Sequence, residues 1–152
     1  MAVKTKNFSN QTYKRYFFDS YSRCTLNGHF GYVVDITWLA SGSRLASASH
    51  DGTVKIWDTQ KVECLLTLQE GLGNVNCVSS TNSGLYLASA GYDGRVYFWN
   101  LKTGNLIQNF EGPGRIMEAR FNHSDSKFVI TSYGVVIVLE LSFNKIIKIH
   151  NS

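Results

Sequence analysis

Short apolar runs separated by polar turns alternate along most of the chain, and this pattern predicts β-strands. The first part of the chain holds the runs VVDITW (33–38), RLASAS (44–49), TVKIW (53–57) and ECLLTL (63–68). Turn-forming residues, such as ASGS at 40–43, lie between the runs. No stretch sustains a helical period, so the sequence predicts an all-β fold.

This group of runs returns twice. LASASHDGTVKIWD (45–58) aligns with LASAGYDGRVYFWN (87–100), and a weaker copy follows as KFVITSYGVVIVLE (127–140). The first and last runs of the later copies are VNCVSS (75–80), NLIQNF (105–110), IMEARF (116–121) and KIIKI (145–149). A repeat of about 40 residues with four strands is typical of a β-propeller blade.

The turn between the second and third runs is marked by Asp51-Gly52 in the first copy and by Asp93-Gly94 in the second. An Asp-Gly pair between two strands predicts a two-residue hairpin turn of type I′. Glycine supplies the positive φ angle that such a turn demands.

Gly28-His29, Ser47, Asp51 and Trp57-Asp58 resemble the WD40 repeat, and three such repeats cover residues 25 to about 149. The resemblance implies a partial β-propeller of about three four-stranded antiparallel blades, at residues 28–69, 70–111 and 112–152. The third blade is degenerate, because it lacks the Asp and the Trp.

The residues before the first blade look like part of another blade. The segment YKRYFFDSYSRCTLNGH (13–29) has YFFD where the first repeat has KIWD, followed by CTL. Residues 13–27 are therefore predicted to form a two-stranded remnant, and residues 1–12 a polar basic arm.

The WD40 resemblance also implies a buried hydrogen-bond relay. It would run from Asp51 to His29, from His29 to Ser47, and from Ser47 to the indole of Trp57. Buried polar groups of this kind are normally satisfied in closed networks.

In the second copy Ser89, Asp93 and Trp99 match the relay, but Gly71 stands where the histidine should be, so water or another side chain must complete it. In the third copy Val129, Tyr133 and Leu139 take the equivalent places and predict an apolar version.

A hydrolase is the alternative interpretation, because Ser47, Ser49, His50 and Asp51 are the residue types of a hydrolytic triad. Catalysis needs an exposed nucleophile, a base within reach and an oxyanion hole. Ser47 instead lies inside a predicted strand, and no G-x-S-x-G motif is present. We therefore expect a framework role and no enzymatic activity.

Charge and cysteine content narrow the function further. The 152-residue chain carries a net charge of +4, and this excess lies in residues 1–24, which hold five basic residues and one acidic residue. The rest is balanced, so nucleic-acid binding is expected only as an alternative, through the N-terminal arm. The three cysteines lack metal-ligand spacing, and no metal or cofactor is predicted.

The first twenty residues show no secretory signal, and the apolar runs are too short for a membrane helix. We therefore expect an intracellular protein, cytoplasmic or nuclear, with no membrane partner.

The WD40 resemblance implies a non-catalytic scaffold that binds other proteins or peptides and contributes to multiprotein complexes. The candidate partner-binding residues are those at turn tips: Phe30, Tyr32, His50, Tyr92 and Arg115.

Three blades leave terminal faces bare. The chain is accordingly expected to be part of a larger propeller, a truncated product, or a unit that self-associates or completes a ring with another propeller segment. Its end resembles the last blade of transducin-β-like corepressor subunits, and LASASHDGTVKIWDT resembles the repeats of fungal NACHT-type proteins; these alternatives stay open.

Overall fold

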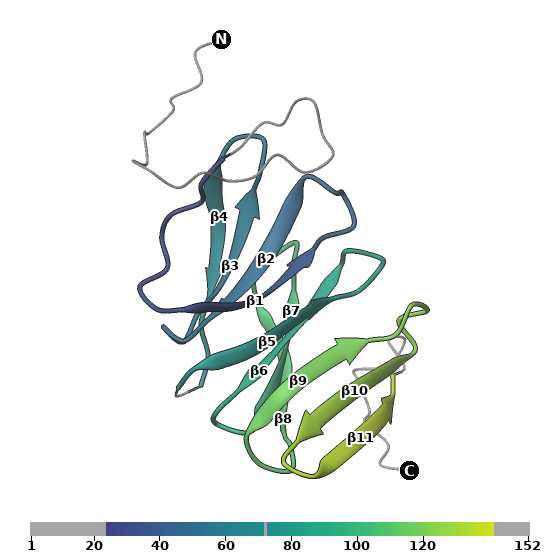
Figure 1. The fold of residues 1–152 in the computed structure, drawn as a ribbon. Helices are drawn as coiled ribbons and strands as arrows, with labels where there is room; N and C mark the ends of the chain where they lie inside the picture. Colours follow the sequence, from purple (N-terminus) through teal and green to yellow (C-terminus); the bar gives the residue numbers. More distant parts are fainter. Residues whose placement is uncertain (1–23, 72, 142–152) are drawn as a thin grey trace, which may run out of the picture.

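The computed structural model describes residues 24–71 and 73–141, which fold into three antiparallel sheets (Figure 1). The first sheet contains β1 (Val33–Trp38), β2 (Arg44–Ser49), β3 (Val54–Asp58) and β4 (Glu63–Leu68). The second contains β5 (Val75–Ser80), β6 (Tyr86–Gly91), β7 (Arg95–Asn100) and β8 (Leu106–Glu111). The third contains β9 (Ile116–Phe121), β10 (Lys127–Ser132) and β11 (Val135–Glu140). The all-β partial propeller is thereby confirmed, and we call the sheets blades 1, 2 and 3.

The strands follow the apolar runs closely. Most predicted bounds coincide with the observed ones, while β3 and β8 begin and end one residue later than predicted. The run at 145–149 and the arm at 1–12 lie outside the described residues. In the described part of the chain no helix could span a membrane.

The predicted strand at CTL (24–26) is not observed: the described residues 24–29 form no strand. This segment instead lies against blade 1. The Sγ of Cys24 approaches the carbonyl oxygen of Thr59 at 3.9 Å, and a Cβ on Gly28 would lie 3.2 Å from the Trp57 ring. The segment therefore covers the indole rather than pairing as a strand. The rest of the predicted two-stranded remnant lies outside the described residues.

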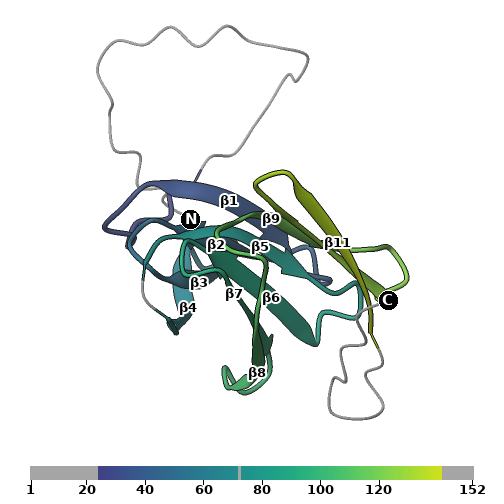
Figure 2. The same ribbon diagram turned by 90° about the horizontal axis from the view of Figure 1, so that it is seen from below.

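The blades are arranged side by side, with their first strands β1, β5 and β9 adjacent (Figure 1). The turned view in Figure 2 shows β4 and β8 farther from this row. Each blade thus has one face toward the preceding blade, which we call its N-side face, and one toward the following blade, its C-side face.

Apolar packing between these faces forms the two cores of the molecule. The C-side face of blade 1 packs on the N-side face of blade 2, in a cluster that includes Ala46, Ala48, Val54, Ile56, Leu87 and Trp99. The C-side face of blade 2 packs on the N-side face of blade 3, in a cluster that includes Ala88, Ala90, Phe98, Phe128, Ile130 and Leu139. Alanines on β2 and β6 leave room for the large rings opposite them.

A polar contact among the first strands also joins the three blades. The Arg120 guanidinium on β9 donates from Nη1 and Nη2 to the Asp35 carboxylate on β1, at 2.8 and 3.0 Å. Between them, Val78 on β5 donates its N–H to Asp35 at 2.8 Å and accepts from Arg120 at 3.0 Å. A bidentate arginine–carboxylate pair fixes orientation as well as distance, so it holds these strands in register.

The hairpin turns are not of type I′, which corrects the prediction from the Asp-Gly pairs. The N–H of Gly52 donates to the Ser49 carbonyl at 3.2 Å, and the N–H of Ser49 donates to the Thr53 carbonyl at 3.1 Å, closing a three-residue loop. Gly52 has a φ of 84°, whereas Asp51 is not among the residues with positive φ. A type I turn followed by a left-handed glycine explains this geometry. The longer loop lets the Asp51 carboxylate turn back toward Thr53.

The equivalent glycine of blade 2 gives a matched test of the turn. Gly94 has a φ of 75°, and an added Cβ would lie 3.0 Å from the backbone of Gly114. Gly134 has a φ of 72°, but an added Cβ would meet nothing within 4 Å. We expect Gly134→Ala to lower the free energy of unfolding by about 1 kcal/mol from backbone strain alone. Gly94→Ala should lower it further, as measured by urea denaturation. Equal losses would contradict the close approach of the two loops.

Candidate functional site

The residues of the sequence motif meet in a continuous relay in blade 1. The indole N–H of Trp57 donates to Ser47 Oγ at 2.7 Å. His29 Nε2 lies 2.7 Å from the same oxygen, and His29 Nδ1 lies 2.8 Å from Asp51 Oδ2. With the Nδ1 proton directed at Asp51, Nε2 accepts the Ser47 hydroxyl proton, so the donors run in one direction from Trp57 to Asp51.

The Asp51 carboxylate ends the relay and also fixes two loops. It accepts the N–H of Phe30 at 2.9 Å, and from Thr53 it accepts the N–H at 2.9 Å and the hydroxyl at 2.6 Å. Burial alone would raise the pKa of Asp51, but the hydrogen bonds from Thr53, Phe30 and His29 outweigh it and hold that pKa well below its usual range. Asp51 therefore stays ionised and ties the loop before β1 to the β2–β3 turn.

The relay is sealed rather than open to a substrate. Ser47 is only 3% exposed, and its hydroxyl lies between the indole of Trp57 and the imidazole of His29. Ser49 is fully buried, and its Oγ accepts the N–H of Asp51 at 3.1 Å. The His50 ring instead contacts the rings of Tyr32 and Tyr92. These four residues thus do not form an exposed nucleophile with its base.

In blade 2 the aspartate is partnered by a tyrosine that sequence reasoning missed. Trp99 donates to Ser89 Oγ at 2.9 Å, as in blade 1. The hydroxyl of Tyr97 donates to Asp93 Oδ2 at 2.7 Å, and a Cβ on Gly71 would collide with both groups. The phenol therefore occupies the space of the absent histidine. Burial, followed by the neighbouring Asp93, raises the pKa of Tyr97 to about 12, so the hydroxyl keeps the proton that it donates.

Blade 3 has an apolar centre, as expected, but the residue at the serine position is different. β10 pairs Ile130 with Ala119, just as β6 pairs Ser89 with Val78, so Ile130 takes the serine position. Val129, the predicted residue, faces the other side of the sheet. The alignment was wrong by one residue on β10 because the turn at Tyr133-Gly134 is shorter than the turns of blades 1 and 2. Ile130 and Leu139 are buried and pack on blade 2, whereas Tyr133 is exposed.

Four of the five predicted turn-tip residues form a row across all three blades, which we call the loop row: Tyr32, His50, Tyr92 and Arg115. The rings of Tyr32 and His50 meet edge to face at a centroid distance of 6.3 Å. The rings of His50 and Tyr92 are 5.7 Å apart, and Arg115 Cζ lies 3.4 Å from the Tyr92 ring centroid. The contacts are in the range of favourable aromatic and cation–π interactions.

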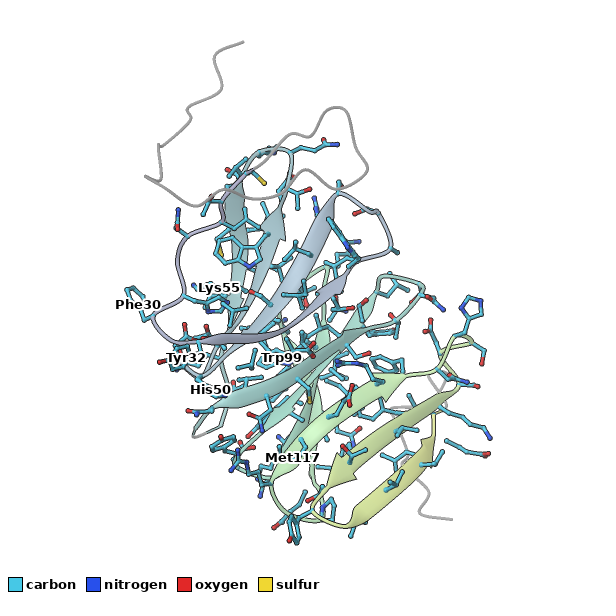
Figure 3. All side chains as sticks on the ribbon, in the orientation of Figure 1. Phe30, Tyr32, His50, Lys55, Trp99 and Met117 are labelled. Carbon is cyan, nitrogen blue, oxygen red and sulfur yellow. The ribbon has the colours of Figure 1, made fainter. Side chains whose placement is uncertain are left out.

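The fifth predicted residue, Phe30, lies beside the row. Figure 3 shows Phe30, Tyr32 and His50 together at one edge of the molecule. Phe30 is 97% exposed and Tyr32 81% exposed, so their rings face solvent. The backbone beneath them is held in place, because His50 donates its N–H to the Tyr32 carbonyl at 2.9 Å. The row is thus an exposed aromatic surface on a fixed frame.

The nucleic-acid alternative rests on basic residues that lie outside the described part of the chain: Lys4, Lys6, Lys14, Arg15 and Arg23. In the described part of the chain, basic side chains such as Arg95, Arg120 and Lys127 lie near acidic ones.

Comparisons with known proteins agree with this architecture. A family model described as "WD domain, G-beta repeat" matches residues 20–58 and 62–100, a little over half of the chain. Protein tipD of Dictyostelium discoideum is 41% identical over 61 residues, which cover 40% of this chain and 9% of that protein. The β-propeller domain of Myceliophteria thermophila Cps50 (Swd1) matches with a TM-score of 0.66 and 24% identity, covering 74% of this chain and 36% of that one. The chain thus spans a small part of the curated relative and about a third of the solved propeller, and the structural likeness concerns the fold alone.

The two serines of the relays give a matched pair of variants. Ser47 Oγ is hydrogen-bonded to both Trp57 and His29, whereas Ser89 Oγ accepts the indole N–H of Trp99. An unpaired buried polar group costs about 1–3 kcal/mol. We therefore expect Ser47→Ala to lower the free energy of unfolding more than Ser89→Ala does, as measured by urea denaturation. The difference between the two losses should be about the cost of one unpaired group. A Ser47→Ala protein with unchanged stability would contradict the framework role.

The lowered pKa of Asp51 predicts a pH dependence of stability. The folded state holds Asp51 ionised more strongly than the unfolded state, in which its pKa is about 3.9. Its contribution to stability is therefore present above that pH and is lost as the pH falls further. Asp51→Asn should lower the free energy of unfolding by about 2 kcal/mol at neutral pH. The gap between the two proteins should narrow below pH of about 4, as measured by denaturation at a series of pH values. A gap that widens with acid would show that Asp51 is not the ionised end of the relay.

Proposed function

The chain belongs to the WD40-repeat family, whose propellers serve generally as scaffolds for protein–protein interaction, and we propose that it binds a protein or peptide through the loop row. We further propose that this binding contributes to the assembly of a multiprotein complex and that the chain catalyses no reaction. The proposal is supported by one observation above all: aromatic residues of blades 1 and 2 and an arginine of blade 3 are aligned at one end of the sheets.

The loop row has the composition of a binding hot spot. Tyrosine and arginine are enriched among the residues that carry most of the binding energy in protein interfaces. Tyrosine also presents a large contact area with few rotatable bonds, so little conformational entropy is lost when a partner covers it. Contacts between neighbouring side chains restrict the rings before any partner arrives. This preorganisation lowers the entropic cost of binding.

Arg115 adds a charge preference to this surface. Its Cζ lies over the Tyr92 ring, 3.4 Å from the ring centroid, and a guanidinium that stacks on an aromatic face keeps its N–H edge directed away from the ring. A planar edge of this kind suits a carboxylate. We therefore propose that the partner presents an acidic side chain or a chain terminus beside apolar side chains that cover Tyr32 and His50.

Selection from a displayed library of random short peptides tests the proposal. The immobilised chain should enrich peptides in which an acidic residue lies near apolar or aromatic ones. When the enriched peptides are synthesised and titrated, Tyr92→Ala and Arg115→Ala should each weaken binding about tenfold or more. Arg115→Lys should also weaken it, because lysine keeps the charge but does not reproduce the stacked planar edge.

Leu85→Ala is the matched control, because Leu85 is an exposed apolar residue in the β5–β6 turn, at the opposite end of blade 2. Its affinity for the enriched peptides should equal that of the unchanged chain. If the library yields no enriched peptide, or if the loop-row variants bind as well as Leu85→Ala, the loop row is not the binding surface.

A further inference from the structure

The chain forms the same kind of interface twice. Blade 1 packs its C-side face on the N-side face of blade 2, and blade 2 packs its C-side face on the N-side face of blade 3. Such a contact joins two different surfaces, so it is heterologous and can continue from one unit to the next. In the described residues the N-side face of blade 1 and the C-side face of blade 3 are the two ends of this series.

Positions that are buried inside the series are exposed at its ends. Val136 on β11 is 69% exposed, whereas Val54 and Val96, which take the same place in blades 1 and 2, are at most 1% exposed. Ile36 on β1 is 61% exposed, whereas the equivalent Val78 and Ala119 are at most 3% exposed. At the two ends of the series these positions hold apolar side chains, as they do inside it, but the side chains are exposed to solvent.

The residues at the two ends are of the types that the internal interfaces use. The C-side face of blade 3 presents the β-branched side chains Val129, Thr131, Val136 and Val138. The N-side face of blade 1 presents large apolar ones, Ile36, Trp38 and Leu45, around the covered indole of Trp57. Small or branched residues opposite large ones also characterise the interface of blades 1 and 2, where Ala46, Ala48 and Val54 meet Leu87 and Trp99. Burial of such faces is the main driving force for association.

A polar contact between blades points to the same register. Asp35 of blade 1 accepts the N–H of Val78 in blade 2 at 2.8 Å. Glu118 is the equivalent of Asp35 in blade 3, because Thr131 pairs with Glu118 as Ala48 pairs with Asp35. The equivalent of the Val78 N–H at the other end of the series is the N–H of Ile36, which here donates within its own strand to Asp35 Oδ1. In a second copy docked in this register, the Ile36 N–H would face Glu118, whose Oε1 in the single chain lies 3.3 Å from Arg120 Nη2.

We propose that the C-side face of blade 3 docks on the N-side face of blade 1 of a second copy of this chain, and that two copies form a closed ring. The occupant is a second copy because the two complementary faces are carried by the same chain and continue an interface that it already makes twice. The described residues of two copies supply six blades, which is within the range of about 4–8 found in closed propellers. This inference concerns the blade faces and is independent of the loop row.

The test uses one variant on each face. Ile36→Lys places a charge on the N-side face of blade 1, and Val136→Lys places one on the C-side face of blade 3. Ile36 and Val136 are exposed in the single chain, so both variants should fold and keep the circular dichroism spectrum of the unchanged chain. In analytical ultracentrifugation the unchanged chain should reach twice the mass of the 17.1 kDa monomer, and each variant alone should remain a monomer. A mixture of the variants should form a heterodimer, because each supplies the face that the other has lost.

Glu118→Ala is a second test variant, which leaves the apolar faces intact. It should dimerise more weakly than the unchanged chain. Leu85→Ala, which alters neither face, should dimerise as the unchanged chain does. A monomer at every concentration would overturn the proposal and indicate another occupant of the faces, such as residues 1–23 of the same chain. Open-ended growth beyond two copies would overturn the closed ring. Variants that stay monomeric in the mixture would overturn the heterologous contact.

Discussion

The indole of Trp57 cannot be buried unless its N–H finds an acceptor, and much of blade 1 follows from this requirement. Ser47 supplies the acceptor, but a buried serine hydroxyl must in turn donate, and His29 accepts from it. His29 then needs Asp51, whose remaining lone pairs bind the N–H groups of Phe30 and Thr53. One buried ring thereby fixes the loop before β1 and the β2–β3 turn. These two loops carry Tyr32 and His50, so the framework also positions the exposed aromatic surface.

The three blades satisfy the same central position in three different ways. Blade 1 uses the complete relay, whereas blade 2 keeps the Trp99–Ser89 bond and gives Asp93 a tyrosine partner. Blade 3 removes the polar groups and fills the space with Ile130 and Leu139. Each solution leaves no buried polar group of the centre without a partner. Shape and hydrogen-bond satisfaction therefore constrain the blade more strongly than the identity of any one residue.

The strands and the blade 1 relay could be predicted from the sequence because both rest on local patterns that repeat. Apolar runs bounded by turns located the strands, and the repeated motif located Ser47, Asp51 and Trp57. The bond from Tyr97 to Asp93 could not be predicted this way, because a tyrosine on a strand has no pattern that marks its partner. The Asp35–Arg120 pair joins residues 85 positions apart, so only the packing of the blades reveals it. Ile130 takes the serine position because the turn after β10 is one residue shorter than the corresponding turns of blades 1 and 2. The similarity of the repeat sequences does not reveal this difference.

The central claim is that Ser47 and Trp57 form a sealed structural contact rather than part of an open site. Hydrogen exchange of the tryptophan indoles, followed by nuclear magnetic resonance, tests this claim most directly. The indole N–H groups of Trp57 and Trp99 should exchange far more slowly than that of free tryptophan under the same conditions, and Ser47→Ala should accelerate exchange at Trp57. Exchange of the Trp57 indole at the rate of free tryptophan in the unchanged chain would contradict the account.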